Sequence, residues 1–254
     1  MKMQKFVVLF LGIALIFTSC QNSKNPTAPK VLDESQMQTA PTQPADDTSD
    51  SQIVSPQYPS GTTVIVAIGD SITYGTGASQ GYPAKLEAKL RAAGYSAVVL
   101  NEGVPGEQSP ETDDRFLRTI AGAQIVLLMI GINDIINPVG CSEYACDTIG
   151  HIDSMLTKAL ISEIIPLVST VTPIRAGSYF ESDNWNIQAL NSEIYTRAAA
   201  HKVVVVDNYT AILSQGGSIL YSDSVHFNDQ GYDVIAQQWY DAIVGNNLIQ
   251  LPKK

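Results

Sequence analysis

Histidine, cysteine and basic side chains are scarce in this sequence. The 254-residue chain has three histidines and three cysteines, and its 15 lysines and arginines stand against 25 acidic residues. The formal net charge of −10 argues against a protein that binds nucleic acid or anionic lipid headgroups, because both partners attract basic surfaces. No internal repeat is apparent.

Phosphate-binding signatures are also missing. Gly75-Thr76-Gly77 is not followed by the Gly-Lys-Ser/Thr of a P-loop, and no G-x-G-x-x-G follows the first predicted strand. A nucleotide-binding α/β protein is therefore a weak interpretation of this chain.

The first twenty residues have the composition of an export signal. Lys2 and Lys5 precede an apolar run over residues 6–17, which is too short to span a bilayer comfortably and is typical of a secretory signal peptide. The run ends in Phe-Thr-Ser-Cys, which resembles a bacterial lipobox, and we expect Cys20 to carry the lipid. The protein would then be exported and anchored to a bacterial membrane, facing the periplasm or the cell exterior, with Cys20 its only membrane contact. The alternative is a plain signal peptide with an incidental cysteine.

Residues 21–60 are rich in Pro, Ser, Thr, Gln and Asp and have almost no aromatic side chains. Such a segment cannot bury enough apolar surface to offset its ordering entropy, so we interpret it as a disordered tether. A flexible chain of roughly 40 residues has a root-mean-square reach of about 35 Å. Residues 61–254 remain for a single folded domain.

Two cysteines remain once Cys20 is assigned to lipid. Cys141 and Cys146 are closely spaced, and an even pair in an exported protein suggests a disulfide, which thiol titration of the unreduced protein would test. Two free thiols are the alternative. Two cysteines alone make a poor zinc site, which usually has four protein ligands.

From residue 61 onward, strand-like and helix-like segments alternate. Strands are predicted over residues 62–68, 97–100, 124–130, 164–171 and 203–206. Helices are predicted over residues 82–93, 110–121, 148–161, 184–200 and 231–244. Five strands alternating with helices predict a three-layer α/β/α sandwich around a five-stranded parallel sheet. Ligands bind at the carboxyl ends of the strands in such sheets, so residues just after each strand are the informative ones.

Two of these strand ends hold polar or glycine-rich turns. Gly69-Asp70-Ser71 follows the first predicted strand, where a serine at a sharp turn can present its hydroxyl above the sheet. It is not a G-x-S-x-G elbow, because Thr73 replaces the second glycine. Asn101-Glu102-Gly103-Val104-Pro105-Gly106 follows the second predicted strand, and its glycines let backbone N–H groups approach a ligand.

Two further motifs complete a possible site. Gly131-Ile132-Asn133-Asp134 follows the third predicted strand, and an asparagine amide can donate to an oxyanion. Asp223-Ser224-Val225-His226 precedes the last helix, and an aspartate three residues before a histidine can fix the imidazole tautomer. His151 and His201 lie at helix ends, where solvated or capping roles are expected.

Taken in this order, the four motifs resemble those of the SGNH (GDSL-type) hydrolase superfamily over about residues 62–245, and the resemblance implies the flavodoxin-like fold of that superfamily. The resemblance implies that Ser71 is the nucleophile, His226 the base and then the acid, and Asp223 the residue that orients His226. It also implies an oxyanion hole formed by the backbone N–H groups of Ser71 and Gly106 and the Asn133 side chain. Gly103 is the competing choice for the second donor.

Asp70 and Asp134 are expected to be structural and to bond within their own turns. The resemblance further implies a serine esterase that forms an acyl-serine and needs no metal or organic cofactor. We expect a small ester or an acetylated glycan as substrate, and a preference for short acyl groups. A lysophospholipase or thioesterase of the same superfamily is the alternative, and a catalytically inactive glycan-binding module is the alternative from a different class.

Substrate specificity is expected to come from the loops over residues 135–147 and 174–184. Neither is a long apolar stretch of the kind that covers a lipid-binding cleft. The second contains Tyr179 and Phe180, with Trp185 just beyond, and these rings could stack on sugars. They could equally pack the following helix onto the sheet. The sequence does not indicate an oligomeric state.

Overall fold

A parallel sheet of five strands forms the centre of the domain. The computed structural model describes residues 58–137 and 147–251. Its strands are β1 (Thr63–Gly69), β2 (Ala97–Gly103), β3 (Ile125–Met129), β4 (Ile165–Ser169) and β5 (Val204–Val206). They lie in the order β2-β1-β3-β4-β5, and every neighbouring pair is parallel.

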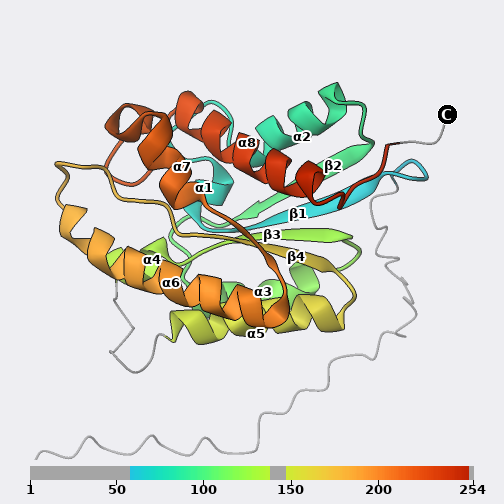
Figure 1. Ribbon diagram of the computed structural model, residues 1–254, viewed down its shortest axis with the longest axis horizontal. Coiled ribbons are helices and arrows are strands. Elements are labelled where there is room, and N and C mark those ends of the chain that lie inside the picture. Colours follow the sequence, from blue (N-terminus) through green and yellow to red (C-terminus); the bar gives the residue numbers. More distant parts are fainter. Residues whose placement is uncertain (1–57, 138–146, 252–254) are drawn as a thin grey trace, which may run out of the picture. The chain divides into compact units, whose positions relative to one another are not determined.

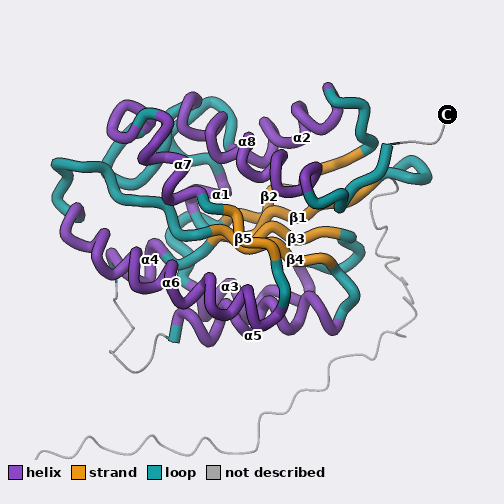
Figure 2. Tube along the Cα trace, viewed as in Figure 1, coloured by secondary structure: helices purple, strands orange, loops and turns teal. Residues whose placement is uncertain are grey.

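Helices cover both faces of this sheet, as Figures 1 and 2 show. One layer contains α2 (Tyr82–Ala92), α7 (Asn208–Gln215) and α8 (Asp229–Gly245). The other contains α3 (Ser109–Thr119), α5 (Thr148–Ile161) and α6 (Asn184–His201). The predicted three-layer α/β/α sandwich is therefore confirmed.

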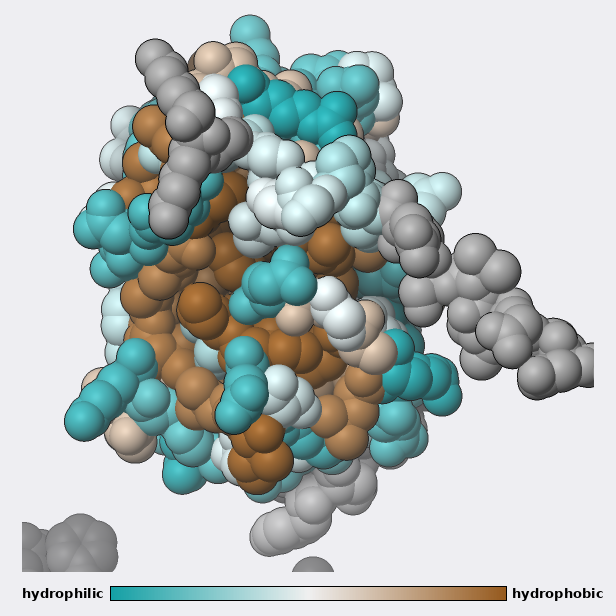
Figure 3. All heavy atoms as spheres, turned by 90° about the vertical axis from the view of Figure 1, so that its right-hand side faces the viewer, coloured by the Kyte–Doolittle hydropathy of each residue, from teal (hydrophilic) through white to brown (hydrophobic). Residues whose placement is uncertain are grey.

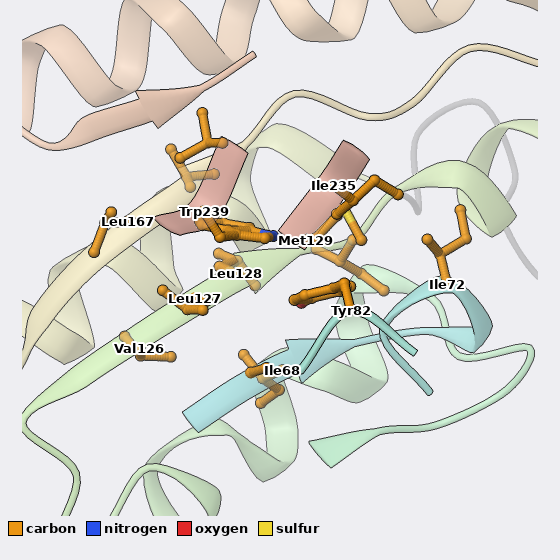
Figure 4. Close-up of a cluster of buried hydrophobic side chains, with 14 of the residues drawn as sticks. Ile68, Ile72, Tyr82, Val126, Leu127, Leu128, Met129, Leu167, Ile235 and Trp239 are labelled. Carbon is orange, nitrogen blue, oxygen red and sulfur yellow. The ribbon is translucent and has the colours of Figure 1, made fainter. Parts of the chain in front are cut away.

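The core is built on the sheet because its central strand is apolar along its whole length. All five residues of β3 are buried, as expected for a parallel strand covered on both faces. Figure 4 shows part of this core, in which Tyr82 of α2 and Trp239 of α8 lie close to Met129. The two rings stack with their centroids 6.0 Å apart, which joins α2 to α8 above the sheet.

The chain reverses its direction of winding next to β1. From β1 it passes through α2 to β2, and from β2 it crosses through α3, on the other face, to β3. In such a sheet the crevice at the carboxyl ends of the diverging strands is the usual place for a ligand. The turns after β1, β2 and β3 therefore meet at the switch point of this fold.

Several elements differ from the sequence-based prediction. Strand β2 runs to Gly103 rather than residue 100, so Asn101 and Glu102 lie inside the strand and pair with Ala67 and Ile68. Two short helices, α1 (Ser71–Tyr74) and α4 (Ile132–Ile136), were not predicted because four or five residues are too few to show a helical period. Helix α7 and the 3₁₀ helices η1 (Glu181–Asp183) and η2 (Gly217–Leu220) were also not predicted.

The opposite end of the sheet is apolar. Figure 3 shows the face at the amino ends of the strands, where hydrophobic side chains gather over a broad area. Ile161 at the end of α5 and Ile165 at the start of β4 are 78% and 42% exposed. In the part of the chain that the structure describes, no helix combines the length and hydropathy needed to cross a membrane.

The other predicted segments fall outside the described residues. These are the signal peptide with Cys20, all but the last three residues of the tether, and Cys141 and Cys146. At the start of the described chain, the Pro59 carbonyl accepts a hydrogen bond from Thr62 N–H.

Candidate active site

Ser71 is the first residue of α1, directly after the carboxyl end of β1. Asp70 caps this helix, and its side chain accepts a hydrogen bond from Ile72 N–H at 2.8 Å. Gly75 ends the helix in a left-handed conformation with φ of 104°. This short turn presents the Ser71 side chain at the sheet edge and leaves its backbone N–H without a partner among the described residues.

A hydrogen-bonded chain runs from Ser71 through His226 to Asp223. His226 Nε2 lies 2.8 Å from Ser71 Oγ, and His226 Nδ1 lies 2.7 Å from Asp223 Oδ2. An ionised aspartate can only accept hydrogen bonds, so Nδ1 carries the proton and Nε2 of the neutral ring is free to accept from the serine hydroxyl. The three side chains that the sequence motifs singled out are thus brought together across 155 residues.

Asp223 is held in its ionised form by its own turn. Burial raises its pKa, but N–H groups of His226 and Val225 donate to Oδ1 at 2.7 and 2.8 Å and, with the His226 ring, hold the pKa below its ordinary value. The turn itself is closed by a bridge between Tyr221 and Phe227, whose ring centroids lie 4.6 Å apart. The histidine is therefore oriented by the ionised Asp223 carboxylate, on a loop whose ends are joined by the bridge and the ring contact.

The two glycines that competed for the second oxyanion donor have different surroundings. Gly103 N–H already donates to Asn101 Oδ1 at 3.0 Å, and a Cβ at Gly103 would lie 2.1 Å from Tyr74 N. Gly106 is exposed, has φ of 83°, and its N–H meets no acceptor among the described residues. Gly103 thus allows close packing of α1 on β2, whereas the Gly106 N–H is available to a ligand.

Asn133 lies in α4, directly after β3. One N–H of its amide donates to the Glu107 carbonyl at 2.9 Å, while no described residue accepts from the other. Ser71, Gly106 and Asn133 follow three neighbouring strands, β1, β2 and β3. Their free N–H groups occupy the same sheet edge, where they can donate to one negatively charged oxygen.

The two neighbouring aspartates behave differently from each other. Asp70 bonds within its own turn, as expected. Asp134 does not: its carboxylate accepts from Ser109 N–H at 3.1 Å and from the Ser109 hydroxyl at 2.5 Å, and from the Thr148 hydroxyl at 3.1 Å. The prediction that Asp134 bonds within its own turn was wrong, because α3 begins beside α4, a tertiary contact with no local signal. Asp134 therefore fixes the start of α3 against the segment that holds Asn133.

Asp70 is a buried carboxyl with an unusual pKa. Burial raises its pKa from 3.8 to about 7, the hydrogen bond from Ile72 opposes the rise, and the charges of Asp134 and Glu107 add to it. Because folding raises this pKa, the contribution of Asp70 to the free energy of unfolding is greatest below pH 3.8. That contribution is lost as the pH rises through about 7.

We expect Asp70→Asn to be more stable relative to wild type at pH 8 than at pH 5. Asparagine keeps the oxygen that caps Ile72 but cannot ionise, so the difference should grow with pH by on the order of 2–3 kcal/mol. Urea unfolding of both proteins at the two pH values measures it. A difference that does not change with pH would contradict a raised pKa for Asp70.

Neither remaining histidine lies in the site. His151 Nδ1 lies 3.2 Å from Asp113 and His201 Nε2 lies 3.0 Å from Asp153, so both pair with aspartates rather than being solvated or capping groups as expected. Within residues 58–137 and 147–251, no group of three or more His, Cys, Asp or Glu side chains is placed to hold a metal ion.

Glu107 and Arg115 were missed by the sequence analysis, although they lie directly beneath the site. Arg115 Nε and an Nη donate to the two Glu107 carboxylate oxygens, each at 2.6 Å. Their signal was weak, because an arginine in a helix usually faces solvent. Arg115 does, however, share the helical spacing of the other buried residues of α3, which include Thr112 and Phe116.

Comparison with known proteins places the chain among hydrolases. Residues 67–234 match the model of the GDSL-like lipase/acylhydrolase family. No curated protein matches the sequence.

Solved structures share the fold at low sequence identity. A lipase/acylhydrolase from Enterococcus faecalis is similar with a TM-score of 0.62 and 22% identity, over 76% of this chain and 100% of the other. A family 3 carbohydrate esterase from Clostridium thermocellum is similar with a TM-score of 0.60 and 22% identity, over 74% of this chain and 100% of the other. A catalytic mutant of an acetylxylan esterase from Geobacillus stearothermophilus has a TM-score of 0.62 and 18% identity, over 71% of this chain and 94% of the other.

Proposed function

Because the chain belongs to the GDSL-like lipase/acylhydrolase family, we propose that it is a serine esterase that hydrolyses short-chain acyl esters. The observation that carries this proposal is the hydrogen-bonded chain from Ser71 through His226 to Asp223. It combines a nucleophile, a base within hydrogen-bond reach and a group that fixes the tautomer of the base.

In the proposed reaction His226 Nε2 takes the hydroxyl proton as Ser71 Oγ attacks the ester carbonyl. The carbonyl oxygen becomes negatively charged and accepts hydrogen bonds from Ser71 N–H, Gly106 N–H and the free N–H of Asn133. His226 then gives its proton to the leaving alcohol, and the acyl-serine remains. His226 then takes a proton from a water molecule, whose oxygen attacks the acyl carbon, and returns the proton to Ser71 Oγ as the bond to Ser71 breaks and the acid leaves.

The loop after β4 supports a carbohydrate ester as substrate. Arg175 N–H in this loop donates to the Ser224 carbonyl of the histidine turn at 2.9 Å, so the loop adjoins the site. Its rings are not equivalent: Phe180 packs against the core, whereas Tyr179 and Trp185 are 91% and 78% exposed. Exposed rings on and just after a loop that adjoins the site offer a surface on which sugar rings can stack.

Two further observations support a small acyl group on a sugar. Residues 174–184 contain no long apolar stretch to cover a fatty chain, where each buried CH₂ would contribute about 0.8 kcal/mol. Solved structures with the same fold include acetylxylan and carbohydrate esterases. A lysophospholipase or thioesterase remains the alternative within the family.

We expect kcat/KM to be highest for acetyl to butyryl esters of p-nitrophenol and to fall toward C8 and C12, and acetylated xylan to release acetate. Trp185→Ala should lower kcat/KM on acetylated xylan by roughly five- to tenfold and leave kcat/KM on p-nitrophenyl acetate unchanged. Tyr195→Ala, an exposed ring further along α6, is the matched control. Three results together would identify a lipid substrate instead: kcat/KM that climbs toward C12, cleavage of lysophospholipid, and no acetate released from acetylated xylan.

We further propose that the enzyme is exported and anchored through a lipid on Cys20. The basic start, the apolar run and the lipobox-like end of residues 1–20 support this, and residues 21–60 would let the domain reach polymers away from the membrane. Metabolic labelling with a radioactive fatty acid should mark the wild-type chain and not Cys20→Ala. Equal labelling of both would exclude Cys20 as the anchor.

A further inference from the structure

A buried ion pair lies directly beneath the proposed oxyanion hole. The Glu107 and Arg115 side chains are only 7% and 10% exposed. Two parallel hydrogen bonds of 2.6 Å join the guanidinium to both carboxylate oxygens, and the Thr112 hydroxyl donates to Glu107 Oε2 at 2.8 Å. This two-point contact fixes the orientation of both side chains as well as their distance.

Arg115 also holds the ends of two strands. An Nη of Arg115 donates to the Glu102 carbonyl of β2 at 2.8 Å and to the Gly69 carbonyl of β1 at 3.4 Å. Gly69 is followed by Asp70 and then Ser71, so the second contact lies two residues from the nucleophile. One guanidinium thus joins the carboxyl ends of β1 and β2.

Glu107 is connected to both of the other proposed oxyanion donors. It directly follows Gly106, so its position sets the direction of the Gly106 N–H. Its carbonyl accepts from Asn133 Nδ2 at 2.9 Å, which fixes the amide and aims the second N–H away from Glu107. Movement of Glu107 would therefore misplace two donors at once.

Stability alone explains this pair poorly. Taking two charges out of water costs several kcal/mol per ion, and buried ion pairs are often replaceable by apolar residues without loss of stability. Transition-state stabilisation is different, because a misplacement of about 1 Å in a catalytic group can cost about a hundredfold in rate. A rigid ion pair suits that requirement.

We propose that Glu107 and Arg115 are positioning residues that hold the Gly106 and Asn133 donors in register with Ser71. The inference rests on the proposed function. Neither residue touches the substrate; both act on the rate through the geometry of the oxyanion hole.

The test compares Arg115→Lys, which keeps the charge but loses the two-point contact, with Glu107→Gln, which keeps the shape but loses the charge. Turnover is expressed per reactive Ser71, counted with a fluorophosphonate probe. We expect kcat on p-nitrophenyl acetate to fall roughly ten- to a hundredfold, with KM within about twofold. The inhibition constant of an alkylboronic acid, whose adduct with serine is tetrahedral, should rise in parallel with the loss of kcat.

Two controls separate positioning from folding. Lys158→Gln removes the pair with Asp113, which joins α5 to the same helix α3 at 2.6 Å, and should leave kcat per reactive serine unchanged. Thr112→Val removes one bond to Glu107 with little change of shape, and should lower kcat by a smaller factor even if the two main variants do not fold.

The outcomes distinguish this inference from the proposed function. If wild-type protein neither hydrolyses esters nor reacts with the probe, the proposed function fails. If wild type is active and Arg115→Lys, Glu107→Gln and Thr112→Val keep wild-type kcat per reactive serine, only the positioning role is overturned. A fall in thermal stability or in the reactive fraction alone, with kcat unchanged, also overturns it.

Discussion

Replacing Ser71 by alanine is expected to lower kcat on p-nitrophenyl acetate by about 10⁵- to 10⁶-fold, the size of effect seen when a nucleophile of this type is removed. The hydroxyl is the only group removed. Without it His226 has no proton to take and no acyl-enzyme can form. Residual turnover would come from the oxyanion hole and substrate binding alone.

The fold should survive this substitution. Among the described residues, the Ser71 hydroxyl hydrogen-bonds to His226 Nε2 alone, and the His226 side chain is 20% exposed, so water can replace the lost bond. Circular dichroism and thermal unfolding check the fold. Ser79→Ala, at an exposed position where the hydroxyl donates to Asp229, is the matched control and should retain wild-type turnover. A folded Ser71→Ala protein with near-wild-type kcat would show that another residue is the nucleophile.

The second large effect is expected at Asn133. Asn133→Ala should lower kcat by roughly 10²- to 10³-fold, as expected for the loss of one oxyanion donor. The charge that Asn133 stabilises develops only in the transition state, so KM should change little. Steady-state kinetics with p-nitrophenyl acetate separate the two parameters.

Asn137→Ala provides a control from the same segment. Asn137 caps the end of α4 and its side chain is exposed, so kcat should not change. Asn133→Asp keeps the shape but replaces a donor with a negative charge, and should be at least as slow as Asn133→Ala. A rise in KM without a fall in kcat would make Asn133 a substrate-binding residue instead.

The architecture was predictable because each strand carries its own signal. Buried parallel strands are continuous apolar runs, as in residues 125–129, and they alternate with helices that end at glycines such as Gly94. The boundary of β2 was not predictable in the same way. Asn101 and Glu102 have low strand propensity, and only their pairing with Ala67 and Ile68 keeps them in the sheet.

The candidate site was predictable to the extent that its residues lie in local motifs. Ser71 and Asn133 each follow a strand, and Asp223 and His226 share one turn. The choice between Gly103 and Gly106 needed three-dimensional information, since it depends on which N–H already has a partner. Arg115 carried only a weak signal in its helical spacing, because its role comes from contacts with Glu107 and with the carbonyls of Glu102 in β2 and Gly69 in β1.

The central claim is that Ser71 carries the acyl group during catalysis. Its most direct test is to incubate the protein with a fluorophosphonate, digest it and locate the adduct by mass spectrometry, while following the loss of esterase activity. We expect one adduct per chain, on Ser71, with activity lost in proportion to labelling and no adduct on Ser71→Ala. Esterase activity that persists in fully labelled protein, or an adduct on a residue other than Ser71, would contradict the account.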